Sequence, residues 1–137
     1  MRSIALVFAI SLLGFPALAG EAEVKAAQGS ISAQLEAFRA GEDAAAYSFA
    51  APNVKRIFPT LETFMGMVSG GYKPVHHAQS FDFGKFREMS PTSIIQQVMI
   101  VGPDGKDYEA VYTLELQPDG VWRITGVSLR ASNSLST

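Results

Sequence analysis

Residues 106–130 read KDYEAVYTLELQPDGVWRITGVSLR, and their pattern sets the architecture of this chain. Apolar side chains recur at every second position before a central break and again after it: Tyr108, Ala110, Tyr112, Leu114, Leu116, then Trp122 and Ile124. A period of two is typical of a half-buried strand. Pro118, Asp119 and Gly120 form the break and are typical turn residues. The segment therefore predicts two antiparallel strands joined by a tight turn.

Helical patterns precede this hairpin. In residues 21–40, apolar side chains follow one helical face and are Val24, Ala27, Ile31, Leu35 and Phe38. Gly41 is expected to end that helix in a left-handed conformation. Residues 42–51 predict a short second helix, and residues 53–58 predict one more helical turn. Thr60 is expected to cap a third helix, which Ser69, Gly70 and Gly71 end.

Further strands are predicted between the helices and the hairpin. Residues 72–80 predict an irregular strand, and residues 81–89 predict a second one in which Gly84 marks a bulge or a bend. Residues 94–101 predict a third strand that is apolar on both faces. Helices followed by strands are typical of the α+β class. We therefore expect N-terminal helices packed on a curved, mostly antiparallel sheet.

The first nineteen residues have the features of a signal peptide. Arg2 precedes an apolar run at positions 4–13, and Ala17-Leu18-Ala19 matches the pattern that signal peptidase accepts. A membrane-spanning helix needs about 20 apolar residues, and this run is shorter. Residues 1–19 are therefore predicted to be cleaved. The protein is expected to be exported, periplasmic or secreted, and to touch a membrane only through the uncleaved signal.

Composition narrows the function classes. The chain has 137 residues, no cysteine and a formal net charge of −2. Without disulfides, its core alone must hold the exported domain together. The charge balance and the lack of a basic run argue against nucleic-acid binding. We expect a single domain over residues 20–130 and a polar, frayed tail over residues 131–137.

Three runs carry a resemblance to a known family: QLEAFRAGEDAAAYSFAAPNVKRIF, FMGMVSGGYKPV and YTLELQPDGVWRITGVSL. Over residues 31–129 the chain resembles the exported bacterial domain-of-unknown-function family 4864. The matching positions are Phe49, Ala51, Pro52, Phe64, Gly71, Tyr72, Pro74, Tyr112, Asp119, Gly120, Trp122, Arg123 and Ile124. The resemblance implies export and a nuclear-transport-factor-two-like (cystatin-like) cone. It implies no activity, because the family has none assigned.

The motifs for metal or nucleophilic chemistry are missing from the sequence. His76 and His77 are adjacent, and in a strand they would point to opposite faces. No HExxH or cysteine-based metal spacing occurs, and no G-x-S-x-G nucleophile motif occurs. We therefore expect no metal, no cofactor and no catalytic residue.

Two function hypotheses remain. The first is a non-catalytic ligand-binding or accessory module that holds a small apolar ligand or a partner protein. The alternative is a small cofactor-free enzyme of the isomerase or hydrolase type, which would need a buried carboxylate or histidine in the cone. The apolar and aromatic faces of the hairpin favour the first hypothesis. A homodimer is an expectation from the resemblance alone.

The candidate ligand-binding residues are Tyr72, His76 and His77. They can form hydrogen bonds, and they stand near Gly71 and Pro74, where helices are expected to meet the sheet and clefts tend to form. The alternative is that they are ordinary surface residues at the end of the sheet.

Contacts of the hairpin are predicted as well. Trp122 is expected to be buried against Leu35 or Phe38. Arg123 should point the other way and pair with Glu115 or Glu109 across the hairpin. Gly105 and Gly120 should each take positive φ, since each ends a Pro-Asp-Gly turn.

Overall fold

The computed structural model describes residues 16–132. Within them lie five helices and four strands: α1 (Pro16–Ala40), α2 (Asp43–Ser48), α3 (Pro52–Ile57), α4 (Leu61–Gly71), α5 (Lys73–His76), β1 (Ser80–Ser90), β2 (Ser93–Val101), β3 (Asp107–Leu116) and β4 (Trp122–Ala131). The predicted signal peptide falls outside the described residues, apart from the backbone at the start of α1. No helix in the described part is both long and apolar enough to cross a membrane.

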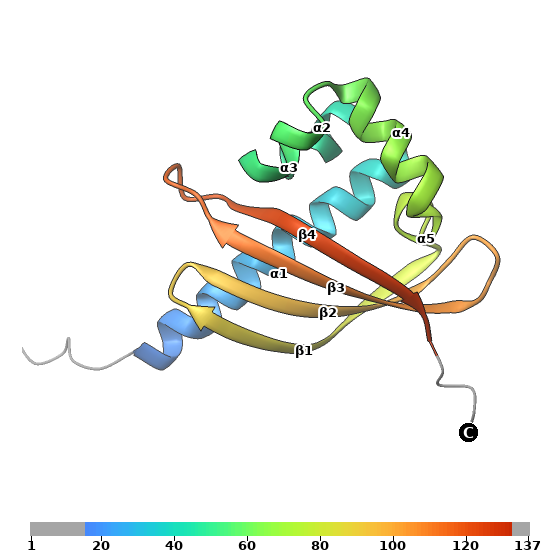
Figure 1. Ribbon diagram of the computed structural model, residues 1–137. Helices are drawn as coiled ribbons and strands as arrows, with labels where there is room; N and C mark the ends of the chain where they lie inside the picture. Colours follow the sequence, from blue (N-terminus) through green and yellow to red (C-terminus); the bar gives the residue numbers. More distant parts are fainter. Residues whose placement is uncertain (1–15, 133–137) are drawn as a thin grey trace, which may run out of the picture.

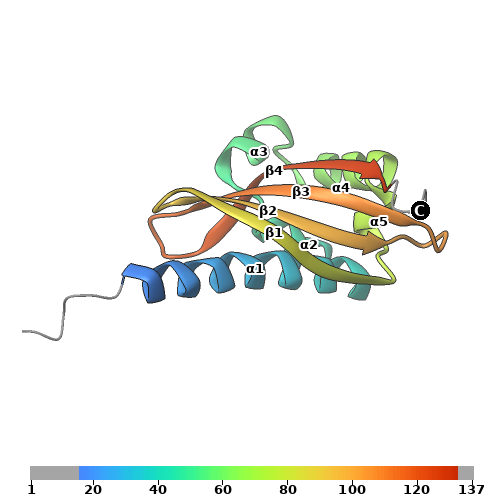
Figure 2. The same cartoon turned by 90° about the horizontal axis from the view of Figure 1, so that it is seen from below.

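The strands form one antiparallel sheet in the order β1-β2-β3-β4. Helix α1 runs along one face of this curved sheet, and α2, α3 and α4 stand beside β4 (Figures 1 and 2). The predicted α+β class, with N-terminal helices on an antiparallel sheet, is confirmed. Of the predicted tail, Ala131 ends β4 and Ser132 donates its N–H to Asp107, while the residues beyond lie outside the described part.

The central face of α1 buries the side chains that its spacing predicted. Ile31, Leu35 and Phe38 are each no more than 2% exposed. They pack against the alternating inner residues of the strands, which include Ile94, Val98, Ile100, Ala110, Tyr112, Leu114, Trp122 and Ile124. The apolar face of α1 and the inner face of the sheet therefore cover each other and form one core, because neither face is stable without a partner.

Both Pro-Asp-Gly turns are built alike, and the predicted backbone is confirmed. Gly105 has φ of 80° and Gly120 has φ of 86°. In each turn an aspartate accepts a hydrogen bond from the backbone two residues later: Asp104 from Lys106 and Asp119 from Val121. Gly41 also has the expected positive φ, at 74°.

Thr60 caps α4 as expected. Its Oγ1 accepts from the Thr63 N–H at 3.1 Å, and the Thr63 hydroxyl oxygen accepts from the Thr60 N–H at 3.2 Å. The predicted bulge at Gly84 is also present, because the β1–β2 register breaks between Phe83 and Phe86. A Cβ at Gly84 would collide with the Gln97 side chain, so a larger residue would displace that amide.

The strand predicted over residues 72–80 is wrong. Lys73–His76 form helix α5, with Tyr72 preceding it, and β1 starts only at Ser80. Pro74 sits in the first turn of α5, where a missing N–H costs nothing. Val75 and Ala78 are buried on the same side, at helical spacing. The segment therefore follows a period near three to four rather than two.

Trp122 is buried as predicted, at 2% exposed, and it belongs to the same core cluster as Leu35 and Phe38. Its polar contacts lie nearer the start of α1. Its Nε1 donates to Glu23 at 2.8 Å, and its carbonyl accepts from Ser30 at 2.6 Å. Figure 1 shows that α1 crosses behind the sheet at an angle and that its middle passes behind β3 and β4.

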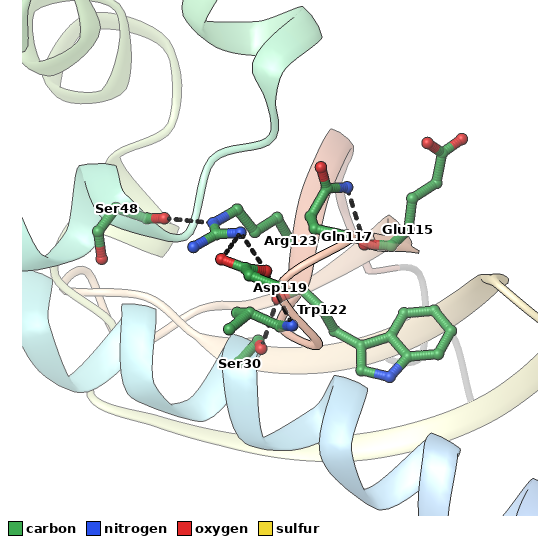
Figure 3. Close-up of polar contacts among 8 residues, drawn as sticks. Ser30, Ser48, Glu115, Gln117, Asp119, Trp122 and Arg123 are labelled. Carbon is green, nitrogen blue, oxygen red and sulfur yellow. Dashed lines mark hydrogen bonds and ion pairs between the residues drawn. The ribbon is translucent and has the colours of Figure 1, made fainter.

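The predicted partners of Arg123 are wrong. Arg123 stands opposite Glu115 in the β3–β4 register, yet its guanidinium bonds Asp119 at 3.0 Å and the Ser48 carbonyl at 3.0 Å (Figure 3). Glu109 pairs with Arg130 instead, at 2.7 Å. Arg123 thus ties the β3–β4 turn to the end of α2, where the orphan carbonyls of a helix need donors.

Candidate ligand-binding cavity

The free edge of β4 is closed by the helical segments. Ala50 and Ile124 form a parallel bridge, in which Ile124 donates to the Phe49 carbonyl and accepts from the Ala51 N–H, both at 2.8 Å. Further along, the Asn53 amide donates to the Thr125 carbonyl at 3.0 Å. These bonds hold the α2–α3 connection against the strand and leave α4 standing above it.

A cavity of about 270 Å³ lies between these helices and β4. Its walls come from α1, α3, α4, the α4–α5 region and β4. The lining residues are Gln34, Phe38, Ala50, Asn53, Val54, Ile57, Phe58, Phe64, Met67, Val68, Tyr72, Val75, Ile124, Thr125, Gly126 and Val127. This volume falls just under the usual range for drug-sized ligands, so a small molecule fits it.

The polar groups in the wall are already hydrogen-bonded to the protein. The buried Gln34 amide donates to the Ala46 carbonyl at 3.1 Å. Asn53 donates to Thr125, and the Tyr72 hydroxyl donates to the Val127 carbonyl at 3.2 Å. Among the described residues, no acidic, basic or histidine side chain lines the cavity. A molecule inside would therefore meet mainly carbon atoms.

Ile57 marks the mouth of the cavity. It belongs to the lining, yet it is 69% exposed, the highest value among the large hydrophobic side chains described. Leu61, at the start of α4, is 37% exposed. Ile57 therefore extends the apolar lining of the cavity to the surface of the molecule.

The structure brings only one of the three predicted site residues to this cavity. Tyr72 lines it, whereas His76 and His77 are not part of the lining. The expectation that the two histidines lie in a strand and point apart is wrong. Their rings are 3.9 Å apart between centroids, and the His76 ring meets the Phe38 ring edge-on at 5.7 Å. His77 is exposed at the end of α5.

His76 has a depressed basicity for a structural reason. Desolvation is the main cause that lowers its pKa, the charge of neighbouring His77 adds to it, and Asp43 opposes both. No cluster of three or more metal-ligating side chains occurs among residues 16–132. The pair therefore has the contacts of a packing element at the corner between α1, α2 and α5.

Sequence reasoning missed most of the lining. Val54 and Ile57 of α3, with Phe58 directly after the helix, recur at positions i, i+3 and i+4, a signal that could have marked the segment as one wall. Gly126 and Val127 were assigned only to a strand. Their place in the cavity depends on the irregular register of β4, which breaks opposite Thr113 and Leu114. No local pattern predicts that break.

The molecule is a small α+β domain whose helices arch over one edge of an antiparallel sheet and enclose an apolar cavity. The chain belongs to the family described as Domain of unknown function (DUF4864), whose sequence model matches residues 20–137. The family resemblance is thus confirmed, while the nuclear-transport-factor-two-like shape and export stay predictions. No curated protein and no solved structure matches the chain.

Proposed function

We propose that this domain is an exported binding module that holds a small, uncharged, apolar molecule in the cavity beneath α3 and α4. The observation that carries the proposal is the cavity itself. It has a volume of about 270 Å³, and its lining consists mainly of carbon atoms and of polar groups that are already hydrogen-bonded to the protein. Burial of apolar ligand surface would supply the affinity.

The same lining favours binding over catalysis. Acid–base catalysis needs a titratable group within hydrogen-bond reach of the reacting atom. In the described residues the lining offers amide groups, one threonine hydroxyl and the Tyr72 phenol, which is engaged with Val127. The enzyme hypothesis would therefore have to recruit a group from outside the cavity.

Export is part of the proposal and rests on the N-terminal pattern of charge, apolar run and small residues. The family match begins at Gly20, directly after the predicted cleavage point, which supports this division. The intact mass of the protein recovered from the exporting cell should correspond to a chain that starts at Gly20. A mature protein that retains residues 1–19 would contradict the proposal of soluble export.

The binding test uses N-phenylnaphthylamine, an uncharged apolar dye whose fluorescence rises when it leaves water. Wild-type protein should bind it saturably, and the dye should raise the melting temperature as ligands of the folded state do. Met67→Trp should abolish the signal, because Met67 lines the cavity and a larger ring would fill it.

Met65→Trp is the matched control. Met65 is a half-buried residue of the same helix but is not part of the lining. Equal binding to wild type and both variants would place the dye elsewhere and contradict the proposed cavity. Turnover of ester or ketone substrates by the wild type would instead favour the enzyme hypothesis.

A further inference from the structure

Within the described residues, hydrogen bonds to the helical segments cover the β4 edge of the sheet but not the β1 edge. Bonds from Phe49, Ala51, Asn53 and Tyr72 cover the outer edge of β4. Strand β1 ends the sheet on the other side, and within residues 16–132 no strand or helix pairs with it on the side away from β2. Free strand edges offer unpaired backbone groups to another strand, so proteins commonly cover or blunt them.

β1 also carries exposed apolar side chains. Phe86 is 52% exposed and Met89 is 54% exposed. Phe81 and Phe83, on the same strand, are only half-buried, and their rings meet edge-on at 5.9 Å. A long edge strand with three phenylalanines is poorly suited to water and well suited to strand pairing.

The bulge in β1 is held by the protein itself. The Gln96 amide donates to the carbonyls of Gly84 at 3.2 Å and Lys85 at 3.3 Å. The Lys85 N–H donates to the Gln97 side-chain oxygen at 3.0 Å. Two glutamines of β2 thus fix the bulge in one conformation, so it does not depend on a partner for its polar groups.

The bulge makes the pattern of side-chain faces along β1 symmetric about Gly84 and Lys85. Phe81, Phe83, Phe86 and Glu88 stand opposite the inward-facing residues Ile100, Val98, Gln96 and Ile94. Asp82 and Arg87 stand opposite Met99 and Ile95 and therefore share the other face. The extra residue of the bulge shifts the alternation of side chains by one position. On either side of the bulge, the nearest side chain, from Phe83 or Phe86, is therefore on the helix side, and the next, from Asp82 or Arg87, is on the other face.

We propose that β1 pairs antiparallel with β1 of a second copy of this chain, about a two-fold axis between Gly84 and Lys85. Phe83 of one copy then stands opposite Phe86 of the other, on the helix side. Asp82 stands opposite Arg87, on the other face, and both pairs occur twice by symmetry. Directly opposed aromatic pairs and opposite charges each stabilise an antiparallel sheet.

The other face-matched registers are unfavourable. Registers that miss the bulge centre on a single residue. One centred on Asp82 or Arg87 opposes that charge to itself, and one centred on Phe86 opposes Arg87 to Lys85. Like charges directly opposite each other destabilise strand pairing. Only the register centred on the bulge opposes Asp82 to Arg87 and Phe83 to Phe86, and the result is a continuous sheet through two copies with helices on the same face. This interface is independent of the cavity and of the function proposed for it.

Sedimentation analysis of the purified protein over a range of concentrations tests the proposal. Wild type should form a dimer that dissociates on dilution. Arg87→Glu and Asp82→Arg should each raise the dimer dissociation constant about tenfold or more, because each replaces two attractive pairs by two repulsive ones. Arg56→Glu is the charge-matched control on exposed helix α3 and should leave the dimer intact.

The decisive sample is a mixture of the two variants. At a concentration where the wild type is mostly dimeric, Asp82→Arg and Arg87→Glu should each be mostly monomeric alone, yet together they should form a heterodimer. In the mixed pair the two substituted positions face each other with opposite charges, and the unchanged Asp82 of one chain faces the unchanged Arg87 of the other. Circular dichroism confirms that each variant is folded. A wild type that stays monomeric at its highest soluble concentration overturns the proposal. So does a dimer that both variants leave unchanged, which would indicate pairing through another surface.

Discussion

The hydroxyl of Tyr72 donates a hydrogen bond of 3.2 Å to the carbonyl of Val127, a residue 55 positions later in the chain. This bond joins the junction between α4 and α5 to the outer edge of β4 and forms one wall of the apolar cavity. Tyr72 is also the residue that links the site predicted from the sequence to the site that the structure contains.

Substitutions at Tyr72 and at His77 test separately whether each predicted site residue contributes to ligand binding. Tyr72→Ala should weaken dye binding strongly, because it removes part of the cavity wall. Tyr72→Phe should retain binding and lose about 1 kcal/mol of folding stability, the usual net worth of a hydrogen bond. His77→Ala should bind the dye as wild type does. Equal binding by Tyr72→Ala and wild type would move the site away from this wall.

Trp122 should behave as a buried indole anchored at its nitrogen. Its fluorescence should be blue-shifted in the native protein, and Trp122→Ala should destabilise folding by about 3–5 kcal/mol. Glu23→Ala leaves the indole N–H without its acceptor and should cost about 1–3 kcal/mol. Chemical denaturation measures both. Emission typical of an indole in water, in the folded state, would contradict the packing.

The turn at Gly120 should resist substitution, unlike the glycine in the middle of α1. Gly120→Val places a β-branched residue at φ of 86° and should cost about 1 kcal/mol or more. Gly29→Ala should stabilise the protein by about 0.5–1 kcal/mol, since nothing lies within 4 Å of the added Cβ and alanine favours helix. Thermal unfolding of the two variants should show shifts of opposite sign.

Tyr112 carries a hydroxyl that the core does not satisfy. The side chain is fully buried, and its oxygen is the one buried side-chain polar atom in the described residues without a hydrogen-bond partner. Burial alone raises the pKa of Tyr112 far above its ordinary value. Tyr112→Phe should therefore be neutral or stabilising, by up to about 2 kcal/mol. A clear loss of stability on removing this oxygen would reveal a partner for it.

His76 should make folding less favourable in acid. Its pKa in the folded protein lies below the ordinary value of 6.5, chiefly through desolvation, so the unfolded chain binds more protons there. The contribution is complete above pH 6.5 and is lost as the pH falls toward the folded pKa. His76→Gln should flatten the dependence of unfolding free energy on pH in that window. An unchanged slope would show that other groups produce it.

Sequence periodicity by itself determined the hairpin, the buried face of α1 and the two Pro-Asp-Gly turns. It could do so because alternation, helical spacing and positive φ at Gly105 and Gly120 depend on residues that are close in the chain. The cap at Thr60 is local for the same reason, whereas the bulge at Gly84 is held by Gln96 and Gln97 of the neighbouring strand.

Only the tertiary structure decided that Arg123 bonds the Ser48 carbonyl and that Ile57, Met67 and Val127 enclose a cavity. These outcomes depend on bonds across the edge of β4, such as Ala51 to Ile124 and Tyr72 to Val127. Their partners are more than fifty residues apart in the chain. Local propensity cannot encode such contacts, because the packing of the whole core selects them.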